Sequence, residues 1–341
     1  DAKNQTTTFA YDRNNRLIRE TRPMGQETTY QYNQNNQLAR KTDAKGQKID
    51  YTYDDAGRMT KIEYLSSWGF STKTVNLTYD NAGNLTGYSD GTSSATYAYD
   101  DLYRKTGETV NYGTFSLSTG YSYNKNGTKK SFTYPNGTTV EYTYDANNQP
   151  AGITIPGVGS ISYNNYQWTR PTSMTLPGGG TKQFSYDPLM RTKTITASDP
   201  AQNPQMSYSY SYDKMDNIKA KNTEAGNYAY AYDDLYRLND VQKDSQQTES
   251  YTYDPVGNRL TSATASNWTY NQNNELQSYN GTTYQYDANG NTTQKNAGGQ
   301  VQNYVYDGDN RLIEVKDGSN TVIATYTYDP FGRRIKKDVG G

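Results

Sequence analysis

A short motif recurs along the whole chain of 341 residues and limits what the chain can fold into. The second Tyr of a Tyr-x-Tyr pair, or its equivalent, occurs in sixteen units, and Asp or Asn follows it every time. Repetition at about 21 residues is typical of an array of identical supersecondary units. The sixteen anchors are Tyr11, Tyr32, Tyr53, Tyr79, Tyr99, Tyr123, Tyr144, Tyr163, Tyr186, Tyr212, Tyr232, Tyr253, Tyr270, Tyr286, Tyr306 and Tyr328.

The residues around each anchor predict a β-hairpin. Tyr alternates with a small or polar residue before the anchor, as in residues 51–53, which places both rings on one face of a strand. Asp or Asn at the first turn position and Gly or Asn at the fourth predict a type I turn that closes on a left-handed residue. We interpret the following as the structural repeat motif: Tyr11, Asp12, Tyr53, Asp54, Gly57, Tyr79, Asp80, Gly83, Tyr144, Asp145, Tyr253, Asp254, Gly257, Tyr286, Asp287, Gly290, Tyr306, Asp307, Tyr328, Asp329 and Gly332.

Five units carry a different residue at the fourth turn position, and we expect their turns to have another geometry. Two of these units share the sequence Asp-Asp-Leu-Tyr-Arg, at residues 100–104 and 233–237, which indicates a second sequence that the repeat accepts at its turn. The five residues are Tyr103, Gln167, Met190, Asp216 and Tyr236.

Composition excludes several kinds of chemistry. The chain has no His and no Cys, so disulfides, Cys/His zinc sites and Ser-His-Asp triads are impossible. Acidic pairs such as Asp54-Asp55 fall in the repeated turn column, so we interpret them as turn residues and predict no catalytic residue, cofactor or metal ligand. A net charge of −1 without blocks of like charge predicts no nucleic-acid partner. The chain also lacks an apolar run long enough for a membrane helix.

Tyrosine dominates the residues available for a core. Leu, Ile, Val and Phe are scarce, whereas 37 residues are Tyr, each with a large ring and few rotamers to lose. We expect rows of Tyr rings to stack across neighbouring strands, with the phenolic oxygens directed to water or to turn carboxylates.

Strand number constrains the architecture. Sixteen hairpins supply about 32 strands, which at roughly 4.8 Å each would make a sheet on the order of 150 Å across. Sheets of more than about ten strands curl or split, so we predict an all-β array of about 16 β-hairpins that coils into a hollow spiral shell or part of one. The alternative is an eight-bladed β-propeller, which would require apolar residues on both faces of its blades.

The pattern Tyr-x-Tyr-Asp-x-x-Gly-Arg/Asn-Leu, ending in residues 326–334, closely resembles the YD repeats of RHS proteins. Such repeats occur in bacterial polymorphic toxins, in the C component of insecticidal toxin complexes and in teneurins. The resemblance implies a wall of hairpins that encloses a C-terminal polypeptide. The RHS core segment, its aspartate-dependent self-cleavage site and a toxin tail are missing from residues 1–341, so neither self-cleavage nor toxicity is carried over.

These observations lead to a set of functional expectations. Residues 1–341 are expected to be a single YD-repeat array, a fragment of a larger RHS protein that is secreted or displayed on a cell surface. We expect a non-enzymatic shell segment whose partners are the rest of the parent chain and its enclosed toxin, with secretion-apparatus or cell-surface proteins as further partners. Open strand edges would let the fragment self-associate.

Two other functions compete with the shell. The first is an adhesive or carbohydrate-binding surface array, for which Trp68 is the best exposed stacking candidate, while Trp268 occupies a Tyr position and is expected to pack. The second is a hydrolase, which would require two carboxylates that converge away from the turn column.

Overall fold

The computed structural model describes residues 1–340, and in this range every regular element is a β-strand. The described residues therefore contain no helix that could span a membrane. Contacts between Cα atoms divide the chain into two compact units. The first unit comprises Asp1–Tyr103, Thr109–Leu117 and the residues from Tyr253 onward; the second comprises Arg104–Glu108 and Ser118–Thr252.

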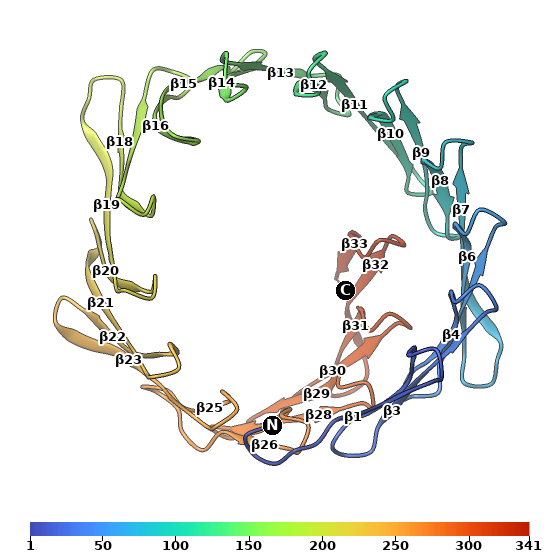
Figure 1. The fold of residues 1–341 in the computed structure, drawn as a ribbon. Helices are drawn as coiled ribbons and strands as arrows, with labels where there is room; N and C mark the ends of the chain where they lie inside the picture. The colour runs from blue at the N-terminus through green and yellow to red at the C-terminus, as the bar shows by residue number, and fades with distance from the viewer. Residues whose placement is uncertain (341) are drawn as a thin grey trace. The chain divides into compact units, whose positions relative to one another are not determined.

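The first unit contains the first nine strands and the last nine, which Figure 1 colours blue to teal and orange to red. Its strands are β1 (Thr8–Tyr11), β2 (Leu17–Thr21), β3 (Glu27–Tyr32), β4 (Leu38–Thr42), β5 (Lys48–Tyr53), β6 (Met59–Leu65), β7 (Ser71–Tyr79), β8 (Leu85–Ser89), β9 (Ser94–Tyr99), β25 (Arg259–Thr261), β26 (Thr269–Tyr270), β27 (Leu276–Tyr279), β28 (Thr282–Tyr286), β29 (Thr292–Ala297), β30 (Gln300–Tyr306), β31 (Leu312–Asp317), β32 (Val322–Tyr328) and β33 (Arg334–Val339).

The second unit contains the middle of the chain. Strands β10 and β24 and the start of β11 lie at its boundaries. Its strands are β10 (Lys105–Asn111), β11 (Ser116–Tyr123), β12 (Lys129–Thr133), β13 (Thr139–Tyr144), β14 (Pro150–Ile155), β15 (Gly159–Gln167), β16 (Arg170–Thr175), β17 (Thr181–Tyr186), β18 (Thr192–Ser198), β19 (Pro204–Tyr212), β20 (Ile218–Thr223), β21 (Gly226–Tyr232), β22 (Leu238–Lys243), β23 (Gln246–Ser250) and β24 (Thr252–Tyr253).

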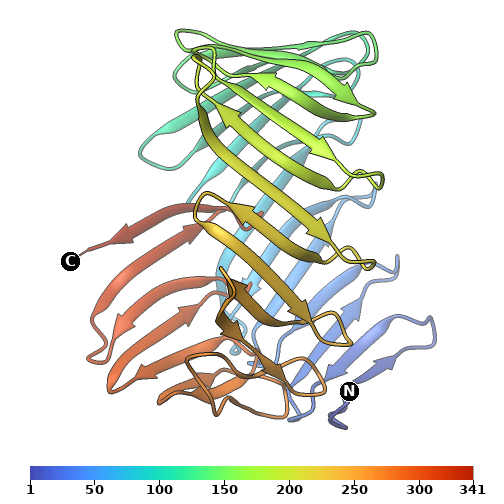
Figure 2. The same cartoon turned by 90° about the vertical axis from the view of Figure 1, so that its left-hand side faces the viewer.

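Successive strands pair antiparallel, as the sequence predicts. Strands β1 to β23 belong to one 23-stranded sheet, and β26 to β33 form an eight-stranded sheet whose ladder Figure 2 shows in orange to red. In a propeller of four-stranded blades, the pairing would break after every fourth strand. Within the second unit, pairing instead runs without a break from β11 to β23. An all-β hairpin array is therefore confirmed, and the propeller alternative is wrong.

The array is interrupted near Tyr253, where the repeat becomes short. Tyr251 separates β23 from β24, and β24 and β25 pair only with each other. Anchors Tyr253, Tyr270 and Tyr286 stand closer together than the usual interval, so β24 and β26 retain two residues each and β25 retains three. Such short strands give few ladder hydrogen bonds, which accounts for the break in the sheet.

The hairpin turns have the predicted geometry. In the third hairpin, the N–H of Gly57 donates to the carbonyl of Asp54, and the N–H of Asp54 donates to the carbonyl of Arg58, both at 2.9 Å. The register shifts by one residue beside the anchor, between Thr52 and Tyr53. This is a type I turn followed by a bulge with a left-handed residue, and Gly57 has a φ of 82°.

The expectation of another geometry in the exceptional turns is wrong for four of the five units. Tyr103, Met190, Asp216 and Tyr236 have φ values of 61°, 62°, 67° and 60°, the same left-handed conformation that Gly and Asn adopt in the other turns. A non-glycine residue in this region costs about 1–2 kcal/mol. The hydrogen bonds of the flanking turn hold these residues in place despite that cost.

The eighth hairpin is the unit that the sequence motif misplaces. Tyr163 and Asn164 lie inside β15, with bulges on both sides of Asn165, and the strand continues to Gln167. The turn follows at Trp168, which has a φ of 58°. Tyr166 takes the anchor's place, because its hydroxyl makes the hydrogen bond to the preceding hairpin that most other anchors make, here to the carbonyl of Pro150 at 2.6 Å.

The most deeply buried hydrophobic positions differ from the expected tyrosine core. In the first unit, Ile49, Tyr64 and Val75 form one buried cluster, and Tyr88, Ala95 and Val110 form another. Most anchor tyrosines are half-buried. Aliphatic residues therefore share the most buried positions with Tyr64 and Tyr88, while most other Tyr side chains cover the sheet around them.

Candidate functional site: the turn motif and the clasp

A side-chain oxygen of Asp or Asn organises the turns of the repeat. One oxygen of Asp80 accepts the N–H of Asn84 and the other accepts the side-chain amide of Asn84, both at 2.8 Å. Where Arg replaces Asn, as at Asp12 and Arg16, the guanidinium Nε donates to the carboxylate at 2.7 Å. These hydrogen bonds, the Arg16 side chain foremost, lower the pKa of Asp12, and the Asn84 side chain is the largest cause of the lowered pKa of Asp80.

The Arg at the fifth turn position also links one hairpin to the next. Arg58 bonds to Asp54 in its own turn, and its Nη1 donates to the carbonyl of Asp80 in the following turn at 2.7 Å. Its guanidinium lies 5.0 Å from the ring centre of Tyr79, the next anchor. The same cation–π contact joins Arg16 to Tyr32, Arg104 to Tyr123, Arg191 to Tyr212 and Arg311 to Tyr328.

The anchor tyrosines complete the link from the other side. The hydroxyl of Tyr53 donates to the backbone carbonyl of Leu38 in the preceding hairpin at 2.9 Å. The expected destination, water or a turn carboxylate, is therefore wrong for these anchors. The anchors with the same type of bond, besides Tyr166, are Tyr32, Tyr53, Tyr79, Tyr99, Tyr123, Tyr186, Tyr212, Tyr232, Tyr270 and Tyr286.

The predicted motif residues lie where the repeat requires them, at the ends of strands and the start of turns. The N–H of each predicted Asp donates to the carbonyl four residues later; these are Asp12, Asp54, Asp80, Asp145, Asp254, Asp287, Asp307 and Asp329. The predicted glycines have positive φ; they are Gly57, Gly83, Gly257, Gly290 and Gly332. The predicted tyrosines end their strands; they are Tyr11, Tyr53, Tyr79, Tyr144, Tyr253, Tyr286, Tyr306 and Tyr328.

The first unit also brings distant repeats together, which the sequence reasoning missed. The residues before β1, the turns after the first two hairpins and the ends of β6 and β8 contact the hairpin turns of β24–β33, and we call this set of contacts the clasp. Figure 1 shows β28 to β30 beside the N-terminal strands β1 and β3. Lys3 pairs with Asp254 at 3.0 Å, Arg22 with Glu275 at 2.6 Å, and Lys45 with Asp287 at 3.2 Å. Each pair joins residues more than 240 positions apart.

The clasp changes from ionic to aromatic along its length. The hydroxyl of Tyr64 donates to the carboxylate of Asp309 at 2.7 Å. The rings of Tyr88 and Phe331 then meet edge to face, with centres 5.3 Å apart. From Arg22 onward, each contact joins the outer strand of one hairpin, or the turn that follows it, to the hairpin turn twelve units later, so the clasp keeps a fixed register.

The electrostatics of the clasp favour its closed form. Burial raises the pKa of Asp287, but hydrogen bonds from Asn291 and Lys45 outweigh burial, and the net pKa lies below its usual value. Burial together with the hydrogen bond to Asp309 raises the pKa of Tyr64, which keeps the phenol protonated as the donor. No signal in a single repeat distinguishes the residues of the clasp, because the same residue types stand at the same turn positions in other repeats, as Asp12 and Asp54 do at the position of Asp254 and Asp287.

The two most exposed tryptophans have different surroundings. Trp68 is 87% exposed at the tip of the turn between β6 and β7. Trp168 is 83% exposed in the second unit and borders a groove of about 390 Å³. Asn147, Tyr163 and Asn165 also line this groove. Trp268 stacks on Tyr279 with ring centres 4.3 Å apart, so it packs within the sheet.

The acidic pairs lie at turns. The second carboxylates, those of Asp55, Asp101 and Asp234, are exposed at turn tips. Within residues 1–340, no group of three or more acidic residues could hold a metal ion.

Comparisons with known proteins identify the repeat. The model of the Teneurin YD-shell matches residues 62–214 and 202–341, which together are well over half of the chain. The chain belongs to the Teneurin YD-shell family. The RHS repeat model matches this YD-shell chain at residues 11–41 and 32–64. The resemblance to YD repeats of RHS proteins is therefore confirmed.

Two curated relatives are named as a toxin and as a nuclease. The YD-shell chain is 32% identical over 167 residues to "Double-stranded DNA deaminase toxin A" of Burkholderia cenocepacia, covering 46% of this chain and 12% of the relative. It is 35% identical over 116 residues to "tRNA3(Ser)-specific nuclease WapA" of Bacillus spizizenii, covering 31% of this chain and 5% of the relative. The matches therefore span a small part of either relative.

A solved structure shares the YD-shell fold. The structure titled "Crystal Structure of TcdB2-TccC3-TEV" matches with a TM-score of 0.72 at 15% identity, covering 95% of this chain and 21% of the other. At this identity the likeness concerns the fold alone.

Proposed function

We propose that the chain is a non-enzymatic wall segment of a shell that encloses the C-terminal polypeptide of an exported RHS-type protein. The observation that carries the proposal is the linkage of successive hairpins, in which anchor hydroxyls, and in several units a turn carboxylate with its Arg, bind one hairpin to the next. Family membership and the shared fold support it. In this proposal residues 1–341 act as a single array, and the parent chain and its enclosed toxin are its partners.

The chemistry of the repeat suits a wall better than an enzyme. The turn carboxylates already accept two or more hydrogen bonds each, so their protonated form is disfavoured and they are poor general acids. The strands carry Thr, Ser, Gln and Asn between the tyrosines, which would let a wall face an unfolded chain without strong apolar adhesion. Export to the outside of the cell, and contacts with secretion or surface proteins, belong to the same proposal.

Protease protection tests enclosure in the full-length parent protein. We expect the C-terminal polypeptide to resist a protease in native buffer and to be cut once urea unfolds the array. A matched sample of the C-terminal polypeptide alone should be cut at once in native buffer. Equal cleavage rates with and without the array would contradict the proposal.

A specific observation favours carbohydrate binding as a second candidate function. The groove beside Trp168 combines an exposed flat ring with the amide side chains of Asn147 and Asn165, and such rings stack on sugar faces while amides hydrogen-bond to hydroxyls. Trp68, the residue singled out from sequence, has the exposure that stacking needs. Glycan-array binding that Trp168→Ala abolishes and Trp68→Ala preserves would support the groove. Glycan binding that only Trp68→Ala abolishes would support Trp68 as the stacking residue. A wild-type chain that binds no glycan would reject this function.

A further inference from the structure

The groove beside Trp168 lies where the eighth hairpin departs from the repeat. Strand β15 continues past Tyr163 to Gln167 and has bulges on both sides of Asn165. Bulges redirect side chains and are common beside binding sites. Tyr163 and Asn165 line a groove of about 390 Å³, which Trp168 also borders. The departure from the repeat therefore coincides with the groove.

Trp168 stands at a turn position that favours Gly. Gln167 pairs with Arg170, so Trp168 is the first residue of a two-residue turn, and its φ is 58°. A side chain in this left-handed region raises the free energy of the turn, which is why Gly is preferred at such positions. The Trp168 ring is 83% exposed, so packing within the chain recovers little of this cost. Strained residues of this kind cluster at ligand sites.

Asp145 differs from the other turn carboxylates of the predicted motif. One of its oxygens, Oδ1, accepts the N–H groups of Asn147 and Gln149, both at 2.8 Å. The side chain of Gln149, which stands where the other turns have Arg or Asn, donates instead to the carbonyl of Trp168 in the next hairpin. Within residues 1–340, no donor bonds to the second oxygen of this exposed aspartate, Oδ2. In the other turns of the predicted motif, that oxygen accepts a side-chain N–H from the residue four positions later; the pairs are Asp12 and Arg16, Asp54 and Arg58, Asp80 and Asn84, Asp254 and Asn258, Asp287 and Asn291, Asp307 and Arg311, and Asp329 and Arg333.

The groove has the charge of a cation site. The unused oxygen of Asp145 supplies a negative charge, and the rings of Trp168 and Tyr163 supply negative ring faces. In the described part of the chain, neither Lys nor Arg is among the residues that line this groove. The side-chain amides of Asn147 and Asn165 can hydrogen-bond to hydroxyl groups. An organic ammonium that also carries hydroxyls therefore matches the groove.

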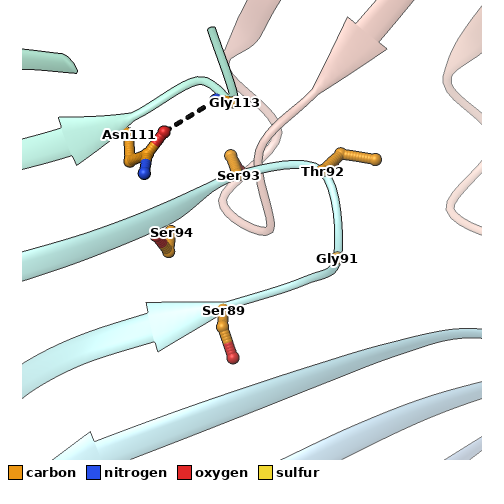
Figure 3. Close-up of a pocket in the computed structure, with 7 residues that line it drawn as sticks. All are labelled: Ser89, Gly91, Thr92, Ser93, Ser94, Asn111 and Gly113. Atoms are coloured by element: carbon orange, nitrogen blue, oxygen red, sulfur yellow. Dashed lines mark hydrogen bonds between the residues drawn. The ribbon is translucent and has the colours of Figure 1, made fainter. Parts of the chain in front are cut away.

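A second groove, in the first unit, shows the contrast. It has a volume of about 250 Å³, and Figure 3 shows that Ser, Thr, Gly and Asn residues line it. The carboxylate next to it in the chain, that of Asp90, is buried and pairs with Lys73 at 2.8 Å. This groove offers hydroxyls and amides but neither an aromatic ring nor an open charge. The ring and the open carboxylate together therefore distinguish the groove beside Trp168.

We propose that the groove beside Trp168 binds an amino sugar with a free ammonium group. The sugar ring stacks on Trp168, its ammonium pairs with Oδ2 of Asp145, and its hydroxyls bond to the amides of Asn147 and Asn165. The inference rests on the carbohydrate-binding candidate function and names the class of sugar. It is independent of what the array encloses.

Two trimeric sugars test the proposal on the full chain. One is the trimer of glucosamine, which carries ammonium groups, and the other is the trimer of N-acetylglucosamine, which carries none. In calorimetric titrations at low salt, we expect the glucosamine trimer to bind about fivefold more tightly, which is the effect that an exposed ion pair can supply. The preference should shrink at high salt, because ions screen the pair. Fluorine NMR of the fluorotryptophan-labelled chain should show a shift of the Trp168 resonance and none of the Trp68 resonance.

The matched variants isolate the carboxylate. Asp145→Asn removes the charge and keeps the turn, because Asn33 accepts the same two backbone N–H groups in the second hairpin, so this variant should bind both trimers equally. Asp234→Asn is the control, since it removes the same charge from an exposed turn tip outside the groove and should keep the preference. Gln149→Arg is a second variant, in which the guanidinium occupies Asp145 as the Arg of other turns does, and it should lose the preference as well. Circular dichroism checks that each variant folds.

The outcomes separate this inference from the function on which it rests. Equal binding of the two trimers to the wild-type chain would overturn the inference and leave the carbohydrate-binding candidate in place. Binding of neither trimer would overturn it too, and an empty glycan array would then reject carbohydrate binding altogether. A full preference in the folded Asp145→Asn chain would show that another group recognises the ammonium. Ethylammonium that binds as tightly as the glucosamine trimer would show that the sugar ring contributes nothing, and would also overturn the proposal.

Discussion

The hydrogen bond between Tyr64 and Asp309 offers the sharpest test of the clasp. Tyr64 is 8% exposed, and its hydroxyl donates to the Asp309 carboxylate at 2.7 Å. Tyr64→Phe removes this bond and keeps the ring. A hydrogen bond to a charged group is worth about 1.5–3 kcal/mol. Asp309 retains Arg311 at 3.1 Å, so we expect the lower end of that range.

Hydrogen exchange of backbone amides measures this loss of free energy strand by strand. A loss of about 1.4 kcal/mol corresponds to a tenfold change in an equilibrium constant, so exchange through opening of the clasp should be about ten times faster in β30–β33. Amides of β11–β23 should exchange at the wild-type rate. Tyr103→Phe is the matched control, because Tyr103 is 65% exposed at a turn tip. Unchanged exchange in β30–β33, or equal acceleration throughout the chain, would refute the reasoning.

Three further predictions concern the repeat. Gly257 has a φ of 92°, so Gly257→Val should destabilise the chain by about 2 kcal/mol or more and Gly257→Asn by less, in thermal melts; an unchanged melting temperature for the Val variant would disprove the turn assignment. Tyr236 is an exposed non-glycine residue with a φ of 60°, so Tyr236→Gly should raise stability by up to about 1 kcal/mol in urea unfolding, and a loss would show that its side chain stabilises the turn. The pKa values of Asp12, Asp80 and Asp213 are lowered, chiefly by side-chain hydrogen bonds from Arg16, Asn84 and Asn217, while burial raises those of Tyr51 and Tyr284 to about 12. Stability from the Asp residues should be complete above about pH 4 and fall as the pH drops further, and stability from the Tyr residues should be lost as the pH rises from about 10 through 12; a flat profile in either range would contradict these assignments.

The sequence by itself determined the local structure, because every contact in the hairpin turn joins residues at most four positions apart. Asp80 and Asn84 form the hydrogen bonds of their turn without help from distant residues. The alternation of Tyr with polar residues defines the strand that precedes the turn. The hydrogen bond from the Tyr53 hydroxyl to the Leu38 carbonyl also recurs with the repeat, but it forms only where neighbouring hairpins pair, so the sequence of one unit does not predict it.

Tertiary structure decided what the repeat leaves open. Tyr163, which Asn164 follows, fits the motif in sequence, whereas Tyr166, which Gln167 follows, does not. Only the pairing of β15 with β16 selects Tyr166 as the anchor. Tyr236 adopts the left-handed conformation because the flanking turn holds it there. The clasp joins positions twelve units apart, and the long-range packing that chooses which turns meet is not encoded in any single unit.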